Sequence, residues 1–442
     1  MTSLAQRIIL CGAAWLALAA RLPAEGRADD SNFRPYVVGS RAAGMGGAFT
    51  ALADDGGGPY YNPGGIAFAR RSSLSLSASV YGLVSGTFSD ALGDGHNFNY
   101  QDLNTFPVST SVIIKFGALD TPDGSPANAF ALSAFVPDAF RIDDRDSIRS
   151  SQNAFFLSDE EQTVWAGLTY GRRFGRIGIG ISSFVLIGSA TTHLDLTAAP
   201  NMNEFATISE RIDESTIGFV GAAGLRFDPS DHLRLGLSIY SPELGGGSRR
   251  AFVRVAVAPN MAGQPSQIVV VNADDLHTTP ALPLRAQAGA AWTSGTFTIS
   301  ADAMFLAPRD VTDDADRAAD GLDRHIVRNA VVNGSLGAEL VAAGLVPIRA
   351  GFFTDFAASN EPLAQPPGTP NPNATNTSHV NRFGGTFSIG YKTEHTATDA
   401  GLILSYGSGK EVVPHNLNFQ DLIPTTETQL YAYIFLASSY EF

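Results

Sequence analysis

The chain has 442 residues, of which 16% are charged and 44% hydrophobic, and its formal net charge is −14. Soluble domains carry roughly 25% charged residues, so this chain is poor in charge for a surface covered by water. The acidic balance argues against nucleic acid as a partner, because phosphates attract a basic surface. The single cysteine, Cys11, excludes a disulfide framework and a thiolate metal cluster.

Residues 1–28 are typical of an export signal. Arg7 supplies the positive charge, residues 8–20 supply the apolar stretch, and small residues before position 29 offer cleavage sites. No later segment has the roughly 18 consecutive apolar residues that a membrane-spanning helix needs. We therefore expect export from the cytoplasm and no spanning helix in the mature chain.

Residues 29–70 form the second predicted unit. A short helix can form within residues 41–53, although Gly44, Gly46 and Gly47 weaken it and indicate close packing of the backbone. The lumen of a barrel with about fourteen strands is wider than its own side chains can fill. We therefore expect residues 29–70 to fold as a compact plug in the lumen of such a barrel.

From residue 72 onward, apolar and polar residues alternate in blocks of about ten, as in strands with one lipid face and one luminal face. The pattern predicts strands at 72–88, 105–118, 127–138, 162–173, 175–190, 215–227, 232–242, 281–293, 295–307, 328–341, 345–355, 383–393, 399–408 and 429–442. Short and long connections alternate between them, as in bacterial outer-membrane barrels, whose short turns are periplasmic. The predicted fold is therefore all-β, a transmembrane antiparallel β-barrel of about 14 strands over residues 71–442.

A soluble β-sandwich of a secreted protein would also show alternation. That fold places charged residues on its solvent face, whereas these strands carry mainly Ser, Thr and Gly there. The chain also ends on an apolar face that finishes at Phe442, which resembles the assembly signal of outer-membrane barrels. Residues 250–257 and 267–271 could pair as one further hairpin, which would keep the strand count even.

Three short motifs lie in the N-terminal unit: GSRAAGMGGA at 39–48, ADD at 53–55 and YNPGG at 61–65. Together they resemble the FadL-type family of outer-membrane transporters for long-chain fatty acids and other hydrophobic compounds. Barrels of secretion and attachment systems share parts of the pattern, and Gly64 stands where the family usually has Ala. The resemblance implies a fourteen-stranded barrel with an N-terminal hatch, and a ligand that leaves sideways through a gap at a kinked third strand.

The third predicted strand, 127–138, contains Pro137, which cannot donate to a β-ladder. Pro137 marks either a gap in the wall or the end of the strand, and we favour the end of the strand.

Inward positions, assigned by the parity that Phe442 sets, supply the candidate ligand-binding residues of the lumen. Aromatic side chains there suit an apolar or amphipathic ligand better than a hydrated ion. The aromatic candidates are Phe135, Trp165, Phe184, Phe353, Tyr431, Tyr433 and Phe435, with Tyr81 and Leu186 as further inward positions. Packing against the plug is the alternative role, and we expect it for about half of them.

Basic residues also recur on the inferred inward face near the periplasmic strand ends, namely Lys115, Arg176, Arg226, Arg234, Arg349 and Lys392. They could attract a carboxylate head group, and Arg226, Arg234 and Arg349 are the candidates for this role. Alternatively they pair with Asp54 and Asp55 of the plug, which we favour. The candidate plug or gate residues are Arg41, Gly44, Gly46, Gly47, Asp54, Asp55, Asn62 and Pro63.

The sequence and the resemblance together predict a monomer in the bacterial outer membrane that admits long-chain fatty acids or similar molecules by passive, ligand-gated diffusion. The expected partners are this ligand, membrane lipid and lipopolysaccharide; acidic loops around Asp143 and Asp310 could at most bridge divalent ions to the latter. No catalytic motif, metal site or cofactor is expected. A structural or secretion-associated barrel that binds proteins through its loops is the alternative.

Overall fold

The computed structural model describes residues 32–33, 37–93, 95–104, 109–119, 121–148, 153–201, 204–258, 267–312, 325–362, 378–415 and 418–442. The predicted export signal, residues 1–28, lies outside them.

Before the strands come three short helices, α2 (Ser40–Gly44), α3 (Gly58–Tyr61) and the 3₁₀ helix η1 (Gly65–Phe68). The strands are β1 (Ser73–Gly93), β2 (His96–Asn104), β3 (Ser109–Phe116), β4 (Asn128–Ile148), β5 (Asn153–Phe174), β6 (Ile177–Asn201), β7 (Glu204–Phe227), β8 (Leu233–Tyr240), β9 (Leu244–Ala258), β10 (Gln267–Thr278), β11 (Arg285–Ser294), β12 (Phe297–Leu306), β13 (Val311–Thr312), β14 (His325–Ile326), β15 (Val331–Ala342), β16 (Val346–Asp355), β17 (Ser378–Lys392), β18 (Thr396–His415) and β19 (Asn418–Glu441).

These strands close into an antiparallel barrel, because β1 pairs with β19 from Ser73↔Glu441 onward. β2 and β3 both pair with β1 and together occupy one place in the wall. β9 prolongs β8 along β7, and β10 pairs with β9, so the pair extends the wall as the hairpin foreseen at 250–257 and 267–271. Counted by place in the wall, the barrel has fourteen strands, as predicted.

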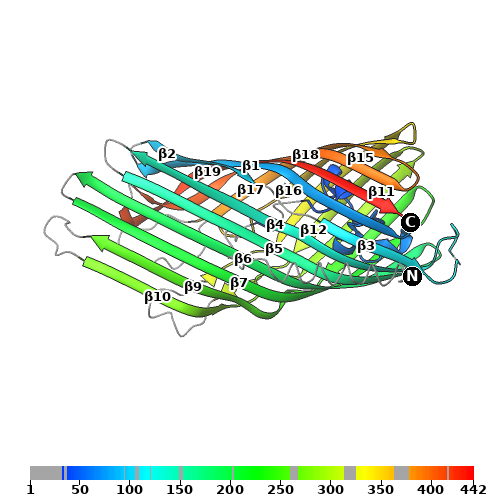
Figure 1. Ribbon diagram of the computed structural model, residues 1–442, viewed down its shortest axis with the longest axis horizontal. Helices are drawn as coiled ribbons and strands as arrows, with labels where there is room; N and C mark the ends of the chain where they lie inside the picture. Colours follow the sequence, from blue (N-terminus) through cyan, green and yellow to red (C-terminus); the bar gives the residue numbers. More distant parts are fainter. Residues whose placement is uncertain are drawn as a thin grey trace, which may run out of the picture.

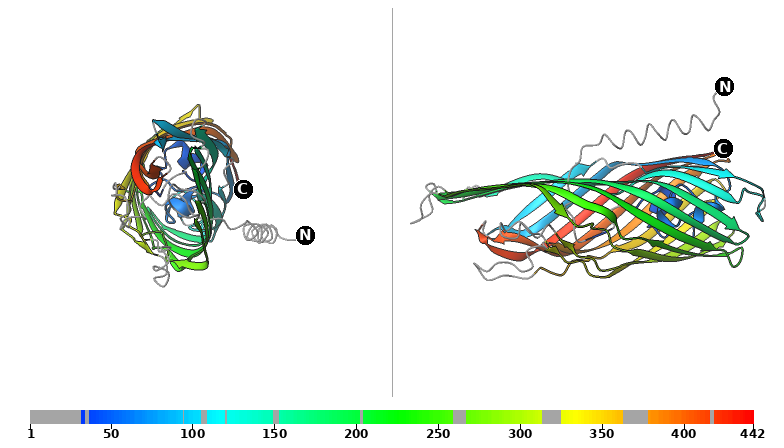
Figure 2. Two further views of the ribbon diagram at one scale, coloured as in Figure 1. Left: turned by 90° about the vertical axis from the view of Figure 1, so that its left-hand side faces the viewer. Right: turned by 90° about the horizontal axis from the view of Figure 1, so that it is seen from below.

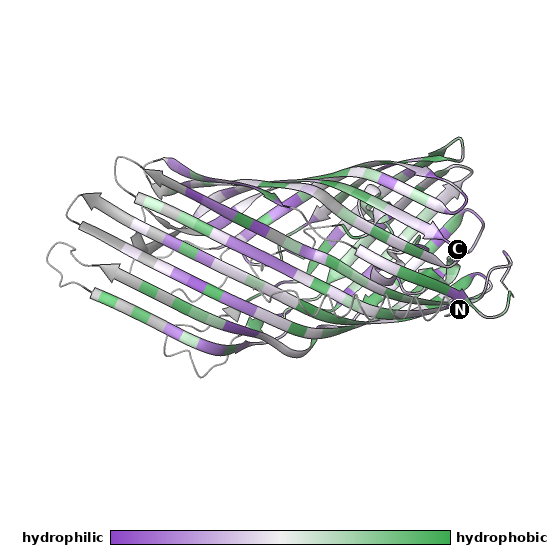
Figure 3. Cartoon of the chain, in the orientation of Figure 1, coloured by the Kyte–Doolittle hydropathy of each residue, from purple (hydrophilic) through white to green (hydrophobic). Residues whose placement is uncertain are grey.

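Side chains of the strands alternate between the outside and the lumen. In β12, Phe297, Ile299 and Phe305 are exposed outward, whereas Thr298 and Ser300 are buried. In β19, Leu430 and Ile434 point outward, and Tyr431 is buried, so the parity set by Phe442 is confirmed. Figure 3 shows hydrophobic positions along the strands near the C-terminus, which is the half of the wall suited to lipid.

The strands β4 to β7 are much longer than predicted, and the expected long loops at 139–161 and 191–214 are wrong. β6 alone has 25 residues, whereas a tilted strand crosses a bilayer in roughly 9–11 residues. The extensions, such as Arg141–Ile148, carry polar residues on both faces, so they lack the apolar alternation that marks a membrane strand. They still pair, because backbone hydrogen bonding does not require a lipid face (Figure 1).

The short turns, such as Gly175–Arg176, and the C-terminus lie at one end of the barrel, which we call the short-turn end. Residues 37–69, called here the luminal segment, lie inside the barrel near that end (Figure 2). Almost all of their side chains are buried. Among the described residues, no helix has the length and apolarity to cross a membrane.

Candidate luminal ligand site

The luminal segment docks onto inward-facing glycines of the wall. A β-carbon at Gly236 would overlap the carbonyl oxygen of Thr50, and one at Gly351 would overlap the backbone nitrogen of Gly46. The other wall glycines whose β-carbon would meet the segment are Gly171, Gly178, Gly180, Gly224, Gly289 and Gly337. Because no side chains intervene there, the backbone of the segment packs directly against the strands.

The glycines of the segment itself are equally constrained. A β-carbon at Gly44 would overlap the hydroxyl of Ser388, and Gly46 has a positive φ of 62°. Gly47 also has a positive φ of 77°, a backbone conformation that residues with a β-carbon rarely adopt. The close packing predicted for these glycines is therefore seen at Gly44 and Gly46.

Ion pairs join the charged side chains of the segment to the wall. Arg226 lies 3.2 Å from Asp54, and Arg41 of the segment bridges Asp54 at 3.1 Å and Glu339 of β15 at 2.7 Å. Arg349 in turn pairs with the same Glu339 at 2.6 Å. The favoured expectation, that basic wall residues pair with the plug, is correct for Arg226, and Arg349 joins the same network through Glu339.

Arg349 also lies 2.6 Å from Asp399 of β18. Arg234 makes no ion pair within the described part of the chain, and it lies outside the cavity described below. The pairs occupy Arg226 and Arg349, so neither is available to a ligand in this conformation.

Polar contacts fix the backbone of the segment at two further points. Asp302 of β12 accepts hydrogen bonds from the backbone N–H groups of Phe49 and Thr50, at 2.8 and 2.7 Å. The Asn62 side chain donates to the carbonyl oxygens of Thr50 and Leu225, at 2.8 and 2.9 Å. The next residue, Pro63, lies against Gly180. Asp55 accepts a bond from the backbone of Gly57, at 2.8 Å, within the segment.

The predicted aromatic residues separate into two buried clusters. Phe135, Trp165 and Phe184 pack with Tyr60 and Tyr61 of the segment. Phe353, Tyr431, Tyr433 and Phe435 pack with Val37 and Ala43 of the segment. Both clusters include residues of the segment, whereas packing against the plug was expected for only about half of these side chains, and of the seven only Trp165 lines the cavity described next.

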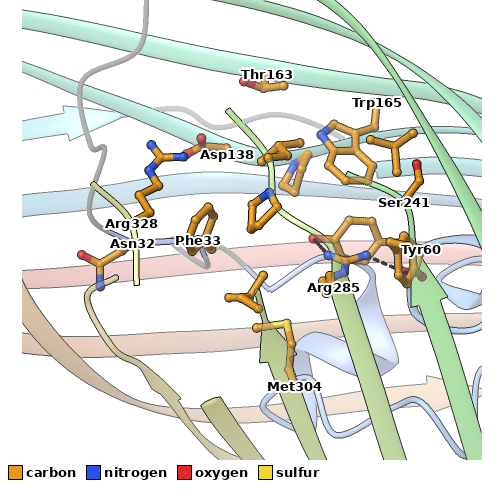
Figure 4. A pocket seen from close by; sticks show the side chains of 16 residues that line it. Asn32, Phe33, Tyr60, Asp138, Thr163, Trp165, Ser241, Arg285, Met304 and Arg328 are labelled. Atoms are coloured by element: carbon orange, nitrogen blue, oxygen red, sulfur yellow. Dashed lines mark hydrogen bonds between the residues drawn. The ribbon is translucent and has the colours of Figure 1, made fainter. Parts of the chain in front are cut away.

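A cavity of about 60 Å³ lies between α3 and the long-loop half of the barrel (Figure 4). Tyr60 and Trp165 lie on its aromatic side and Phe33 and Arg328 on its far side. Tyr240 belongs to the aromatic side, because its hydroxyl bonds the carbonyl oxygen of Tyr60. The remaining lining residues are Asn32, Pro137, Asp138, Thr163, Val220, Ser241, Leu282, Pro283, Arg285, Met304 and Leu306. An apolar cavity that holds benzene measures roughly 150 Å³, so this one must widen before it can hold an aromatic ring.

Arg285 of β11 is the charged group at the aromatic side of this cavity. Its guanidinium lies 3.7 Å from the ring centre of Tyr240, 4.9 Å from that of Tyr60 and 5.7 Å from that of Trp165. It donates to the hydroxyl of Tyr60 at 3.2 Å and to the carbonyl oxygen of Tyr60 at 3.4 Å. The hydroxyl of Tyr240 donates to that same carbonyl oxygen.

Sequence reasoning missed Arg285, Tyr60 and Tyr240. The signal for Arg285 was present, because it shares the inward parity of the buried Gln287 and Ala291. It was overlooked because it stands at the opposite end of its strand from the other basic wall residues. Tyr60 belongs to the luminal segment, so strand parity could not place it.

Pro137 lies within β4, which continues to Ile148, so the interpretation of Pro137 as a strand end is wrong. The register between β4 and β5 shifts between Phe135↔Trp165 and Asp138↔Thr163, which defines a β-bulge at this point. On the other side, the ladder between β3 and β4 is described as far as Thr110↔Ala134. The ladder between β4 and β5 is therefore interrupted beside the cavity.

Three further inward positions were assigned wrongly. Tyr81 is 60% exposed, because a bulge between Ser79 and Tyr81 reverses the parity of β1. Arg176 pairs with Asp231 at the exposed short-turn end, and Lys392 is exposed at the end of β17. Lys115 does point inward, and it donates to the carbonyl oxygen of Ala67 at 2.7 Å.

The acidic loops contain few described residues. Asp143 and Asp144 lie on the extension of β4, and most acids that follow Asp310 lie outside the described residues. Within the described ranges, no three acidic, histidine or cysteine side chains are placed to hold a metal ion.

Architecture and site together define a closed fourteen-stranded barrel with an N-terminal segment in its lumen. Solved structures with this fold are FadL-type barrels, so the resemblance seen in the sequence is confirmed at the level of the fold. A FadL homologue from Pseudomonas aeruginosa has a TM-score of 0.65 and 11% identity, over 93% of this chain and 100% of that one. No family model and no curated protein matches the sequence.

Two transporters of an aromatic hydrocarbon share the same fold. The toluene transporter TodX of P. putida has a TM-score of 0.60 and 13% identity, over 91% of this chain and 97% of that one. The toluene transporter TbuX of Ralstonia pickettii has a TM-score of 0.57 and 14% identity, over 91% and 98%.

Proposed function

We propose that this chain is a passive transporter of hydrophobic small molecules in the bacterial outer membrane. The observation that carries the proposal is the cavity lined by Tyr60, Trp165 and Tyr240, which lies between the luminal segment and the bulge of β4. A cavity lined on one side by several aromatic side chains suits an apolar or amphipathic ligand. The fold is shared with structures described as toluene transporters and a FadL homologue, which supports the same class of cargo.

The small volume of the cavity supports ligand-dependent opening. At about 60 Å³ it is smaller than an aromatic ring requires, so Tyr60 or Phe33 must move when a ligand enters. Tyr60 belongs to the luminal segment, so its movement would be transmitted to the ion pair between Asp54 of the segment and Arg226 of the wall. The proposed gate is therefore the luminal segment, with the long loops on the extracellular side and the short turns on the periplasmic side.

Pro137 and Asp138 line the cavity at the interrupted ladder of β4, which makes the wall at this point the proposed exit. The alternative path runs past the luminal segment to the short-turn end. A cargo that leaves through the wall would enter the membrane without displacing the ion pairs of Arg41 and Arg226.

Uptake by cells tests the proposal. A strain that lacks the gene is compared with the same strain carrying it, with radiolabelled toluene and radiolabelled oleate as cargo. We expect faster uptake of at least one compound when the gene is present. Equal uptake of both compounds in the two strains would contradict the proposal, and co-purification of a stoichiometric protein partner would then favour a structural or secretion-associated barrel.

A further inference from the structure

A second cavity, of about 30 Å³, lies between the luminal segment and the wall at β1, β3 and β19. It shares no lining residue with the cavity beside Tyr60. Seven of its twelve lining residues carry a hydroxyl group, and its one ionisable side chain is Asp55. Because a cavity needs roughly 10–15 Å³ to hold a water molecule, this one has room for a small polar ligand.

The wall side of this cavity is a platform of serine hydroxyls. Ser75 of β1 pairs with Ser111 of β3, and Ser77 pairs with Ser109. Residues directly opposite each other in an antiparallel pair have β-carbons roughly 4.5–5.5 Å apart, so the four hydroxyls stand together on one face. A β-carbon at Gly56 would lie 2.6 Å from the hydroxyl oxygen of Ser75, which places the luminal segment directly over this platform.

Two polar groups of the cavity have unused bonding capacity. Ser111 is 2% exposed, and its hydroxyl has no hydrogen-bond partner among the described residues. The half-buried carboxylate of Asp55 accepts one bond, from the backbone N–H of Gly57 at 2.8 Å, and makes no ion pair in the part of the chain that the structure describes. Carboxylates withdrawn from water are normally paired with a cation or coordinate a metal ion.

The arginines nearest to Asp55 are held by other acids. Arg41 pairs with Asp54 and Glu339, and Arg349 pairs with Glu339 and Asp399. Once Asp55 is included, this ion-pair network contains four arginines and five carboxylates, namely Arg41, Arg226, Arg234, Arg349, Asp54, Asp55, Asp228, Glu339 and Asp399. One negative charge is left over, and a monovalent cation beside Asp55 would balance it.

We propose that Asp55 and the serine hydroxyls of β1 and β3 bind a sodium ion between the luminal segment and the wall. Carboxylate and hydroxyl oxygens are hard ligands that suit a hard cation. The single carboxylate matches a single charge, whereas sites for divalent ions usually draw on several carboxylates. The ion would tie the luminal segment to β1 and β3, where no arginine pair holds it among the described residues.

Sodium-23 NMR tests the site, because the resonance of the ion broadens when a protein holds it. Purified mature protein in a zwitterionic detergent is titrated with sodium chloride at pH 8, and choline chloride keeps the ionic strength constant. Choline is too large for a cavity of about 30 Å³. We expect a saturable broadening in the parent, in addition to a linear part from the exposed acids of the loops.

Asp55→Asn keeps the side-chain shape and the bond from Gly57 but removes the charge, so the sodium affinity should fall at least about tenfold. Asp231→Asn is its control, because that acid is exposed at the short-turn end. Ser111→Ala should weaken the affinity about 3- to 10-fold. Its control is Ser388→Ala, which removes another buried hydroxyl without a partner outside this cavity and should leave the affinity unchanged.

Heat-dependent mobility in gel electrophoresis shows that each variant folds, and thermal unfolding gives a second readout. The parent should melt at a higher temperature in sodium chloride than in choline chloride, because an ion that binds only the folded chain stabilises it. This difference should be absent in Asp55→Asn.

Two results would overturn the inference. One is broadening in the parent that rises linearly with sodium and shows no saturable part, in which case the cavity holds water only. The other is a saturable part that persists unchanged in Asp55→Asn, which would place the ion elsewhere. Neither result depends on uptake of a hydrophobic compound, so the proposed transport function is tested separately.

Discussion

The carboxylate of Asp54 lies 3.2 Å from the guanidinium of Arg226, which pairs a charge of the luminal segment with a charge of the barrel wall. Arg226 is almost completely buried, and its other contacts are Asp228 at 3.0 Å and the carbonyl oxygen of Leu52 at 2.6 Å. Because Arg226 keeps Asp228 when Asp54 is removed, the loss is that of a charge-assisted hydrogen bond, roughly 1.5–3 kcal/mol. The pair therefore holds the segment in place much more firmly than a surface ion pair would.

Asp54→Asn should release the luminal segment from Arg226 and Arg41 while it preserves the shape of the side chain. With about 2 kcal/mol lost from docking, openings in a planar bilayer should become about 30-fold more frequent. The control is Asp231→Asn, which removes an exposed pair with Arg176, worth about 0–1 kcal/mol. An unchanged conductance record for Asp54→Asn would show that this pair does not hold the segment.

Gly236→Ala should displace the segment by steric overlap, because its β-carbon would meet the carbonyl oxygen of Thr50. We expect a higher basal conductance, with a barrel that still closes, because the outward-facing contacts of β8 are unaffected. Gly385→Ala is the matched control, since a β-carbon there lies 3.9 Å from the nearest atom, an ordinary contact. Equal conductance of the two alanine variants would contradict direct docking of the segment on Gly236.

A disulfide between Gly44→Cys and Ser388→Cys should lock the luminal segment to β17. The β-carbon of residue 44 points at the side chain of Ser388, and a disulfide needs β-carbons roughly 3.8 Å apart. The mature chain is expected to lack other cysteines, so only this pair can form within it. If the segment is the gate, oxidation should abolish uptake of labelled toluene and a reductant should restore it.

Each single cysteine variant, treated with the same oxidant, shows whether the substitution alone blocks uptake. Full uptake through the oxidised double variant, with the disulfide verified by mass spectrometry, would exclude a gating movement at Gly44.

The turn at Asp123 should make the barrel sensitive to acid. Partial burial by itself raises the pKa of Asp123, but hydrogen bonds from Thr121, Arg173 and Ser125 outweigh it and hold this pKa below its usual range. A lowered pKa in the folded state contributes stability above the unfolded value of about 3.9, and this contribution is lost as the pH falls through the folded pKa. Because Asp123 is partly exposed, we expect at most about 1 kcal/mol.

The measurement is the melting temperature of the parent and of Asp123→Asn at pH 7 and at pH 3. The variant should melt lower than the parent at pH 7, and the difference should shrink at pH 3. Arg173→Gln should reproduce part of the effect, and the double variant should show less than the sum, because the two side chains interact at 2.7 Å. A difference that grows on acidification would contradict the assigned sign.

The sequence by itself determined the barrel, its strand count and the face of most wall residues. These properties follow from a period of two, which each strand carries locally, as in Phe297 to Phe305. The parity failed at Tyr81, where a bulge inserts a residue, and the length of β4 to β7 was missed because polar extensions pair without alternation.

Only the tertiary structure decided which residues meet in the lumen. Asp54 and Arg226 are 172 residues apart, and Tyr60 and Arg285 are 225 apart, so no local pattern relates them. The ion pairs remove Arg226 and Arg349 from the candidate ligand site, while closure of the barrel around the luminal segment brings Arg285 to Tyr60. Strand parity gives a side chain its face, but its neighbour across the lumen depends on how the whole barrel closes and on what folds inside it.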